Sequence, residues 1–197
     1  MRPELPLADK VAALCDPACY PHPVEGVQPL ETHMSWVFLA GDDAWKLKKP
    51  VQHERLDFRT VSARHFYCLE ELRLNRPLAP EVYLDVVPLR ASQGRLRVGG
   101  SGQTVDWLVR MRRLPASAFL DARLAQGSVT PGDMAAVAER LCGFYRQQAP
   151  APLGTGAYLA LLQRHSEEDE RELLRHPQVL APGPVQAPGA GQRAGLE

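Results

Sequence analysis

The feature that most constrains the fold is a series of three short strand-like segments near the N-terminus. They span residues 26–31, 35–40 and 44–49. Three residues join the first segment to the second, and a Gly-Asp-Asp turn joins the second to the third. Strands with connections this short pair side by side in opposite directions. The sequence therefore predicts an antiparallel meander.

The rest of the chain adds helices and further strands in an order typical of α+β proteins. Thr60 can cap a helix, and glycines between residues 94 and 102 mark turns around a small hairpin. Thr130 and Asp133 form a capping box at the start of a later helix. The predicted elements are helix 7–15, helix 60–78, strands 82–89 and 105–111, a helix from Pro131 and helix 158–175.

The charge balance limits the class of partner. The 197 residues carry 23 basic and 23 acidic side chains, so net charge gives no reason to expect nucleic acid or an anionic membrane as partner. No apolar run approaches the roughly twenty residues that cross a bilayer, and the N-terminus lacks the apolar core of a secretory signal. We therefore expect a cytoplasmic protein.

Two cysteines near the N-terminus raise the question of a metal centre. Cys15 and Cys19 are followed closely by His22, a set of residues that zinc can use. The spacing is C-x3-C, no second cysteine pair follows, and three prolines crowd the segment. Cys68 and Cys142 lie in helical patterns, where a buried inert thiol is the usual role. We expect no metal site.

The third strand has an unusual concentration of lysine. Because side chains alternate along a strand, Lys46 and Lys48 share a face with Ala44, while Trp45 and Leu47 form the core face. Two ammonium groups beside a small residue suit a phosphate-bearing ligand with a flat ring. The alternative is an edge strand that lysines protect from pairing with another chain.

A glutamate on the following helix favours the ligand hypothesis. Projected at about 100° per residue, Glu71 falls within the apolar arc of helix 60–78, whereas Glu70 falls outside it. A carboxylate in such a place is costly without a partner, and a lysine of the neighbouring strand can supply one. Glu71 at the margin of the arc, or paired with Arg64, is the alternative.

Five sequence blocks, taken in order, carry a family resemblance. They are E-T-H-M-S-W-V-F-L-A-G-D (31–42), K-L-K-K-P-V (46–51), L-D-F (56–58), E-E-L-R-L-N-R (70–76) and V-D-W-L-V-R-M-R-R-L-P (105–115). Together they resemble bacterial aminoglycoside-phosphotransferase-like proteins, which have the protein-kinase-like fold. Members of that group are often fused to a C-terminal P-loop ATPase-like domain. The resemblance covers roughly residues 9–150, and the order of the blocks makes it specific.

The resemblance implies a fold and a division of the chain. It implies an α+β kinase-like small lobe, with a five-stranded antiparallel sheet and one helix, followed by the first helices of a truncated large lobe. The implied parts are an N-terminal extension (1–25), the small lobe (26–115) and the helical start of the large lobe (116–178). The composition of residues 179–197, rich in Pro, Gly and Ala, predicts a poorly ordered tail.

The resemblance also implies where ATP would bind. Lys46 takes the place of the lysine that grips the α and β phosphates, with Lys48 as the competing choice, and Glu71 takes the place of the glutamate that holds this lysine. The turn 32–35 takes the place of the phosphate-covering loop, where Thr32 and Ser35 offer hydroxyls and His33 is the less favoured contact. The hinge that meets adenine corresponds to Met111, Arg112, Arg113 and Leu114.

The chemistry of phosphoryl transfer needs residues that this chain lacks. The family's large lobe supplies H-G-D-x-x-x-x-N and a later aspartate, which orient the acceptor and hold magnesium, and neither motif occurs here. We expect the nucleotide-binding portion of a phosphotransferase, or alternatively a noncatalytic kinase-like module. Magnesium would bind only with a large lobe. The expected partners are a nucleotide, the absent lobe or a P-loop domain, and a second copy through exposed apolar surface.

Overall fold

A computed structural model describes residues 4–53, 56–150 and 152–175 of the chain. The chain divides into two compact units, residues 1–147 and 148–197, and each is described by itself. The predicted tail 179–197 lies outside the described residues. The predicted boundaries after residues 25 and 115 stay predictions.

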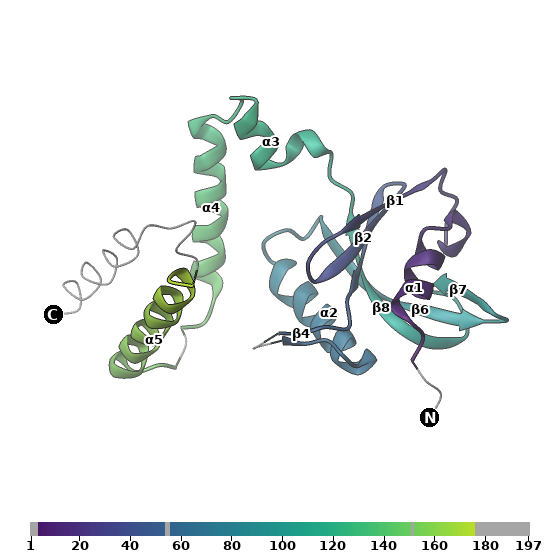
Figure 1. Cartoon of the computed structure of the whole chain (residues 1–197). Coiled ribbons are helices and arrows are strands. Elements are labelled where there is room, and N and C mark those ends of the chain that lie inside the picture. The colour runs from purple at the N-terminus through teal and green to yellow at the C-terminus, as the bar shows by residue number, and fades with distance from the viewer. Residues whose placement is uncertain (1–3, 54–55, 151, 176–197) are drawn as a thin grey trace. The chain divides into compact units, whose positions relative to one another are not determined.

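The first unit is built on a curled antiparallel sheet of six strands (Figure 1). The predicted meander is confirmed, because β2 (Ser35–Ala40) pairs with β1 (Val27–Glu31) on one side and with β3 (Asp43–Lys48) on the other. The α+β class is confirmed as well. The strand order is β1 (Val27–Glu31), β2 (Ser35–Ala40), β3 (Asp43–Lys48), β8 (Gln103–Arg112), β6 (Tyr83–Ser92) and β7 (Arg95–Val98).

The prediction of five strands is wrong by one. Strand β6 continues past Leu89 to Ser92, and the chain then turns back as β7 along its edge. Gln93 and Gly94 make this turn with positive φ angles of 50° and 75°. Positive φ angles at both central residues are typical of a two-residue β-hairpin turn. The hairpin pairs β7 with β6 and so adds a sixth strand to the sheet. A separate two-stranded hairpin is formed by β4 (Gln52–His53) and β5 (Leu56–Asp57).

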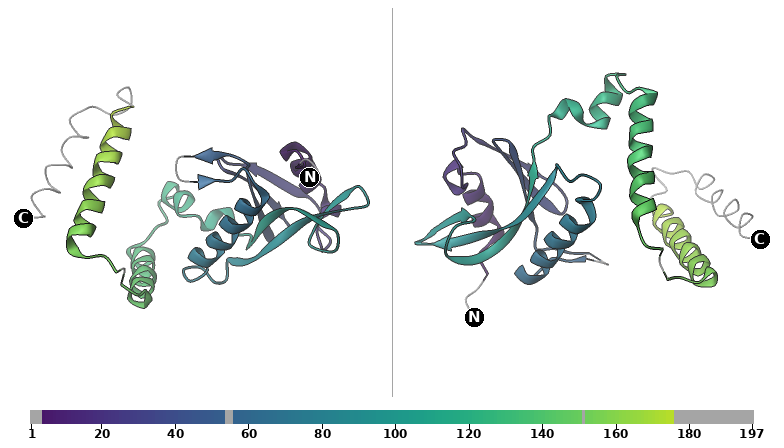
Figure 2. Two further views of the ribbon diagram at one scale, coloured as in Figure 1. Left: turned by 90° about the horizontal axis from the view of Figure 1, so that it is seen from below. Right: turned by 180° about the vertical axis from the view of Figure 1, so that it is seen from behind.

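The two faces of the sheet are covered by two different helices, α1 (Leu7–Leu14) and α2 (Val61–Asn75) (Figure 2). The core cluster lies on the α1 side and includes Trp45 and Leu47, the face predicted for the core. The ring of Tyr20 lies 5.9 Å from that of Trp45 and its hydroxyl donates to the carbonyl of Leu14. The short helix η1 (Pro17–Cys19) completes this layer.

Helix α2 is shorter than predicted. Its start is as expected, since the Thr60 side chain accepts a 3.1 Å hydrogen bond from the Ala63 amide. It ends at Asn75 rather than at residue 78 because Pro77 has no amide to donate and clashes with the preceding turn. The proline that stops the helix is therefore Pro77, three residues before Pro80, the proline on which the predicted end depends.

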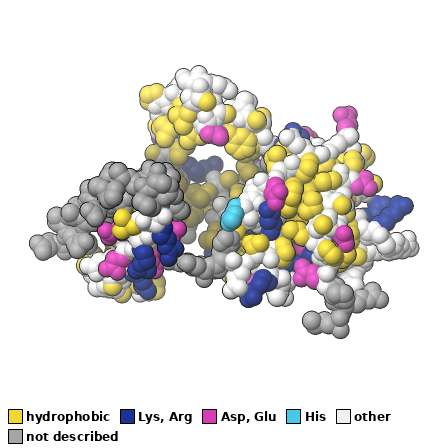
Figure 3. All heavy atoms as spheres, in the orientation of Figure 1, with side chains coloured by type: hydrophobic (Ala, Val, Ile, Leu, Met, Phe, Trp, Pro, Cys, Tyr) yellow, Lys and Arg dark blue, Asp and Glu magenta, His cyan; other side chains and the backbone are white. Residues whose placement is uncertain are grey.

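The later helices are short or carry exposed apolar side chains. Thr130 and Asp133 form the predicted capping box, with 3.2 Å and 2.8 Å hydrogen bonds between each side chain and the other's amide. Figure 3 shows hydrophobic side chains on the surface of α3 (Leu120–Ala125) and α4 (Pro131–Gln147). The exposed apolar residues of these helices include Leu124 and Val137. The elements are η2 (Ala116–Ala118), α3 (Leu120–Ala125), α4 (Pro131–Gln147) and, in the second unit, α5 (Thr155–Leu173).

Within the described part of the chain, no helix has both the length and the apolar character that crossing a membrane requires.

Candidate functional site

The predicted lysine and glutamate meet on the face of the sheet that α2 covers. The Nζ atom of Lys46 lies 2.8 Å from Oε1 of Glu71, and Nζ of Lys48 lies 2.6 Å from Oε2. The sequence offered these lysines as competing partners, and the structure brings both to the same carboxylate. We call Lys46, Lys48 and Glu71 the lysine–glutamate cluster; its formal charge is +1.

Solvent access separates the two lysines. The side chain of Lys46 is 29% exposed, whereas that of Lys48 is 7% exposed. The ammonium of Lys48 also lies 5.1 Å from the centre of the Phe58 ring, an attractive cation–π arrangement. Lys46 is therefore the lysine of the cluster that can reach a ligand, and Lys48 faces inward.

The glutamate is held in its charged form by its two partners. Burial alone would raise the pKa of Glu71, but hydrogen bonds from Lys46 and Lys48 outweigh it and hold the pKa below the usual value. The alternative pairing of Glu71 with Arg64 is not formed, since Arg64 binds Asp106.

Two transverse rows of side chains surround Lys46 on this face. Residues paired across antiparallel strands project from the same side of a sheet, so the pairing register defines each row. Val109 and Ala44 are buried, and the other apolar members beside Lys46 are half-buried or exposed. The rows are Leu30, Val37, Lys46, Val109 and Val86, and next to it Gln28, Leu39, Ala44, Met111 and Tyr83.

This arrangement joins an apolar floor to a single accessible ammonium group. Ala44 has the smallest side chain of its row and lies two residues from Lys46 on the same face. A flat ring can lie against such a floor while an anionic group meets Lys46. The rows were not predicted, because the pairing of β3 with β8 is not visible in the local sequence.

The predicted phosphate-covering turn is closed by its own hydrogen bonds. The Thr32 hydroxyl donates to the Ser35 carbonyl at 2.8 Å and accepts from the Ser35 amide at 3.0 Å. Ser35 is buried, with 2% of its surface exposed. The Thr32 hydroxyl proton is thus already used inside the turn, and a ligand contact by that hydroxyl would have to go through its oxygen.

The predicted hinge segment lies at the C-terminal end of β8, the strand between β3 and β6. Met111 is half-buried beside Ala44, and Arg112, Arg113 and Leu114 are exposed. The amide of Arg112 donates to the Val82 carbonyl and that of Arg113 to the Asp42 carbonyl, both at 2.8 Å. These two amides are engaged within the protein, so a ligand at the hinge would meet other backbone groups.

A buried ionic network lies beside the cluster and was missed at the sequence level. Arg64, Asp106 and Lys10 are each no more than 1% exposed and bind one another through Asp106. The signals were present: Arg64 lies seven residues before Glu71 on the same helix, and Asp106 is an acid in an apolar strand. The partner from α1 could not be identified without the fold.

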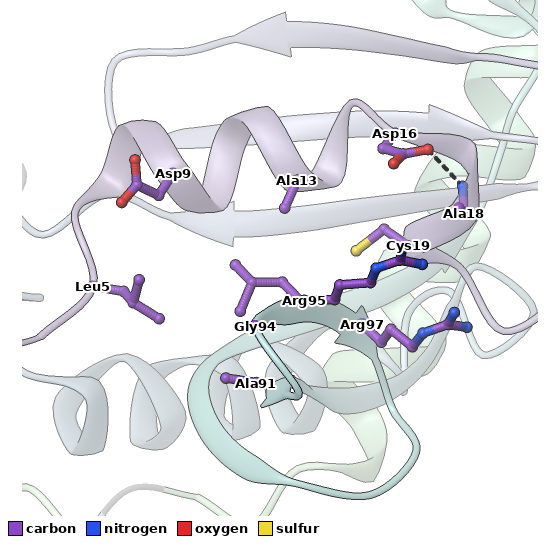
Figure 4. Close-up of a pocket in the computed structure, with 11 residues that line it drawn as sticks. Leu5, Asp9, Ala13, Asp16, Ala18, Cys19, Ala91, Gly94, Arg95 and Arg97 are labelled. Carbon is purple, nitrogen blue, oxygen red and sulfur yellow. Dashed lines mark hydrogen bonds between the residues drawn. The ribbon is translucent and has the colours of Figure 1, made fainter.

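A pocket of about 740 Å³ lies elsewhere, between α1, η1 and the β6–β7 hairpin (Figure 4). Asp9 and Asp16 line it on the helical side, and Arg95 and Arg97 on the strand side. The lysine–glutamate cluster and the predicted turn and hinge residues do not line it, so its size does not bear on the predicted site.

Metal binding has no geometric support in the residues that the structure describes. Among them, no group of three or more His, Cys, Asp or Glu side chains could hold a metal ion. All four cysteines are free; Cys15 is exposed and Cys19 is buried.

Comparison with known proteins gives relatives but no function. The chain is 33% identical over 174 residues to an uncharacterized protein of Mycobacterium bovis and to uncharacterized proteins of two strains of Mycobacterium tuberculosis. The match covers 86% of this chain and 33% of each relative, so the chain spans about a third of their length. No family model and no solved structure matches the chain.

Proposed function

We propose that this chain is the nucleotide-binding portion of an ATP-dependent small-molecule phosphotransferase of the aminoglycoside-phosphotransferase-like, kinase-like type. The observation that carries the proposal is the 2.8 Å pair between Lys46 and Glu71 beside the row that contains Leu39, Ala44 and Met111. The five sequence blocks that resemble this family include both residues of the pair.

The contacts of the cluster give each residue a separate role. Lys46 neutralises phosphate oxygens, while Glu71 holds the ammonium group of Lys46 extended along the sheet. The floor formed by Val37, Ala44 and Met111 takes the adenine ring, and carbonyls of the hinge segment offer hydrogen bonds to it. Phosphoryl transfer itself needs the large-lobe residues that this sequence lacks, and a magnesium ion would be held there.

A nucleotide that binds the folded chain raises its melting temperature. A ligand at 100 times its Kd adds about 2.7 kcal/mol, which raises the melting temperature by several degrees. We expect this shift with millimolar ATP, and we expect Lys46→Met to remove most of it.

Lys49→Met is the matched control. Lys49 lies directly after the same strand, and it pairs with Glu31 and lies 5.8 Å from the Trp36 ring, on the other side of the sheet. Its loss should leave the ATP-dependent shift intact. The proposal fails if ATP does not stabilise the wild-type chain, or if both lysine variants respond to ATP alike.

A noncatalytic kinase-like binding module is the second candidate function. The absence of H-G-D-x-x-x-x-N from these 197 residues favours it over an enzyme that is complete within the chain. The two candidates share the ATP site. They are separated by the gene sequence downstream of this chain, where that motif would support the phosphotransferase.

A further inference from the structure

Four charged side chains form a network between α1, α2 and β8. Nζ of Lys10 donates to Oδ2 of Asp106 at 2.7 Å and to Oε1 of Glu4 at 2.9 Å. Arg64 binds the same two carboxylates. The network holds two positive and two negative charges, and of its side chains that of Glu4 alone is substantially exposed, at 36%.

Arg64 is fixed by every donor that it has. A guanidinium carries five N–H groups in a planar fork. Its Nε and one Nη2 bond serve Asp106, both at 2.9 Å, and the second Nη2 bond goes to Glu4. The two Nη1 bonds reach the carbonyls of Phe58 and Arg59 at 2.8 Å and 3.2 Å. Arg64 thus ties α2 to the N-terminal segment, to β8 and to the chain before the helix.

Two routes connect Arg64 with the lysine–glutamate cluster. Seven residues of α-helix are close to two turns, so Arg64 and Glu71 project from the same face about 10.5 Å apart along the axis. The second route runs through Phe58, whose carbonyl binds Arg64 and whose ring lies beneath the ammonium of Lys48. A shift or rotation of α2 at Arg64 therefore changes the distance from the Glu71 carboxylate to Lys46 and Lys48.

The composition of the network argues for a role in placing α2 rather than in adding stability. Removing three side chains from water costs several kcal/mol per ion, and apolar residues of similar volume can stabilise a core as well or better. A fully satisfied ionic network, by contrast, accepts one arrangement of its elements.

We propose that the N-terminal segment 4–10 sets the position of α2 through Arg64 and Asp106, so that Glu71 meets Lys46 and Lys48. Glu4, Lys10, Arg64 and Asp106 are positioning residues for the cluster. The consequence for nucleotide affinity rests on the proposed function, whereas the consequence for the geometry of Glu71 does not.

The test measures Glu71 directly and ATP binding separately. The variants are Glu4→Gln and Lys10→Met in the full chain, and the control is Arg73→Gln, an exposed α2 residue that pairs with Glu70. The first readout is the titration of the Glu71 side-chain carboxyl carbon by 13C NMR. The groups that act on this carboxylate are Lys46 and Lys48, and Cys68 and Tyr83 interact with it electrostatically. The second readout is the Kd for ATP.

Both variants should raise the pKa of Glu71 towards its usual value, because the carboxylate then lies less close to the two lysines that favour its charged form. The Kd for ATP should increase about tenfold. The control should change neither. If Lys10→Met fails to fold, Glu4→Gln decides, because it removes the shared carboxylate and leaves the contacts of Lys10 and Arg64 with Asp106 in place.

The two proposals fail in different ways. An unchanged Glu71 titration in the folded variants overturns the positioning role, whatever the affinity for ATP. A wild-type chain that binds no ATP, together with a raised Glu71 pKa in the variants, overturns the nucleotide site and supports the positioning role.

Discussion

Lys48 and Lys46 hold opposite oxygens of one carboxylate, at 2.6 Å and 2.8 Å from Glu71. The inner lysine is shielded by Phe58 and the outer one faces solvent. Glu71 therefore keeps one fixed cationic partner when the other turns towards a ligand.

Lys48→Met should lower the stability of the fold more than Lys46→Met, because it removes the buried partner of Glu71. It should weaken ATP binding less, because Lys46 remains to meet the phosphates. Urea denaturation of both variants measures the loss of stability, and ATP titration measures the loss of affinity. Equal losses of stability would contradict the inward role that the 7% exposure of Lys48 assigns to it.

Glu71→Gln should destabilise the first unit by about 2–3 kcal/mol, since it leaves two lysines without a counter-charge, one of them buried. Glu70→Gln is the matched control on the neighbouring position. Glu70 pairs with Arg73 on the exposed side of α2, where such pairs contribute little. Urea denaturation at pH 7 should separate the two variants, and similar midpoints would show that the cluster does not stabilise the fold.

The same carboxylate makes stability depend on pH. The folded pKa of Glu71 lies below its unfolded value of about 4.3, because the two lysines favour the charged form in spite of burial. The stabilisation that the ionised Glu71 carboxylate provides is complete above the unfolded-state pKa. It is lost as the pH falls through the folded-state pKa. The stability difference between wild type and Glu71→Gln should hold from pH 7 to about 5 and shrink below about 4. A difference that stays constant down to pH 3 would contradict the lowered pKa.

Local signals predicted the parts of the fold and site that depend on neighbouring residues. Short turns fixed the β1–β2–β3 meander, Thr60 marked the start of α2, and the helical arc placed Glu71 on the inner face. The sixth strand was missed because a hairpin marked by glycines gives no sign of which sheet it joins. The partnership of Lys10, Arg64 and Asp106 was missed for a related reason: its members lie 42 to 96 residues apart in pairs that only the packing of α1, α2 and β8 brings together.

The cysteines should differ sharply in reactivity. Burial raises the pKa of the Cys19 thiol to about 11 and that of Cys68 to about 12, whereas Cys15 and Cys142 are exposed. The thiolate is the reactive form, so iodoacetamide at pH 8 should modify Cys15 and Cys142 quickly. Cys19 and Cys68 should react only after denaturation. Mass spectrometry over time tests this, and rapid labelling of Cys68 in the native protein would contradict the packing of α2 on β8.

Gly102 lies where the backbone at the end of the β6–β7 hairpin comes close to β6, and its substitution tests that close approach. Its φ is +125°, and a Cβ there would lie 2.4 Å from the carbonyl oxygen of Ala91. Gly94 in the hairpin turn also has a positive φ, +75°, but a Cβ there meets nothing within 4 Å. Gly94→Ala should therefore cost about 1 kcal/mol for backbone strain alone. Gly102→Ala should cost about 3 kcal/mol or more, because a clash with backbone adds to that strain. Urea denaturation of the two alanine variants measures the difference. Equal losses would show that Gly102 is needed for its backbone angle and not for the close approach of β6.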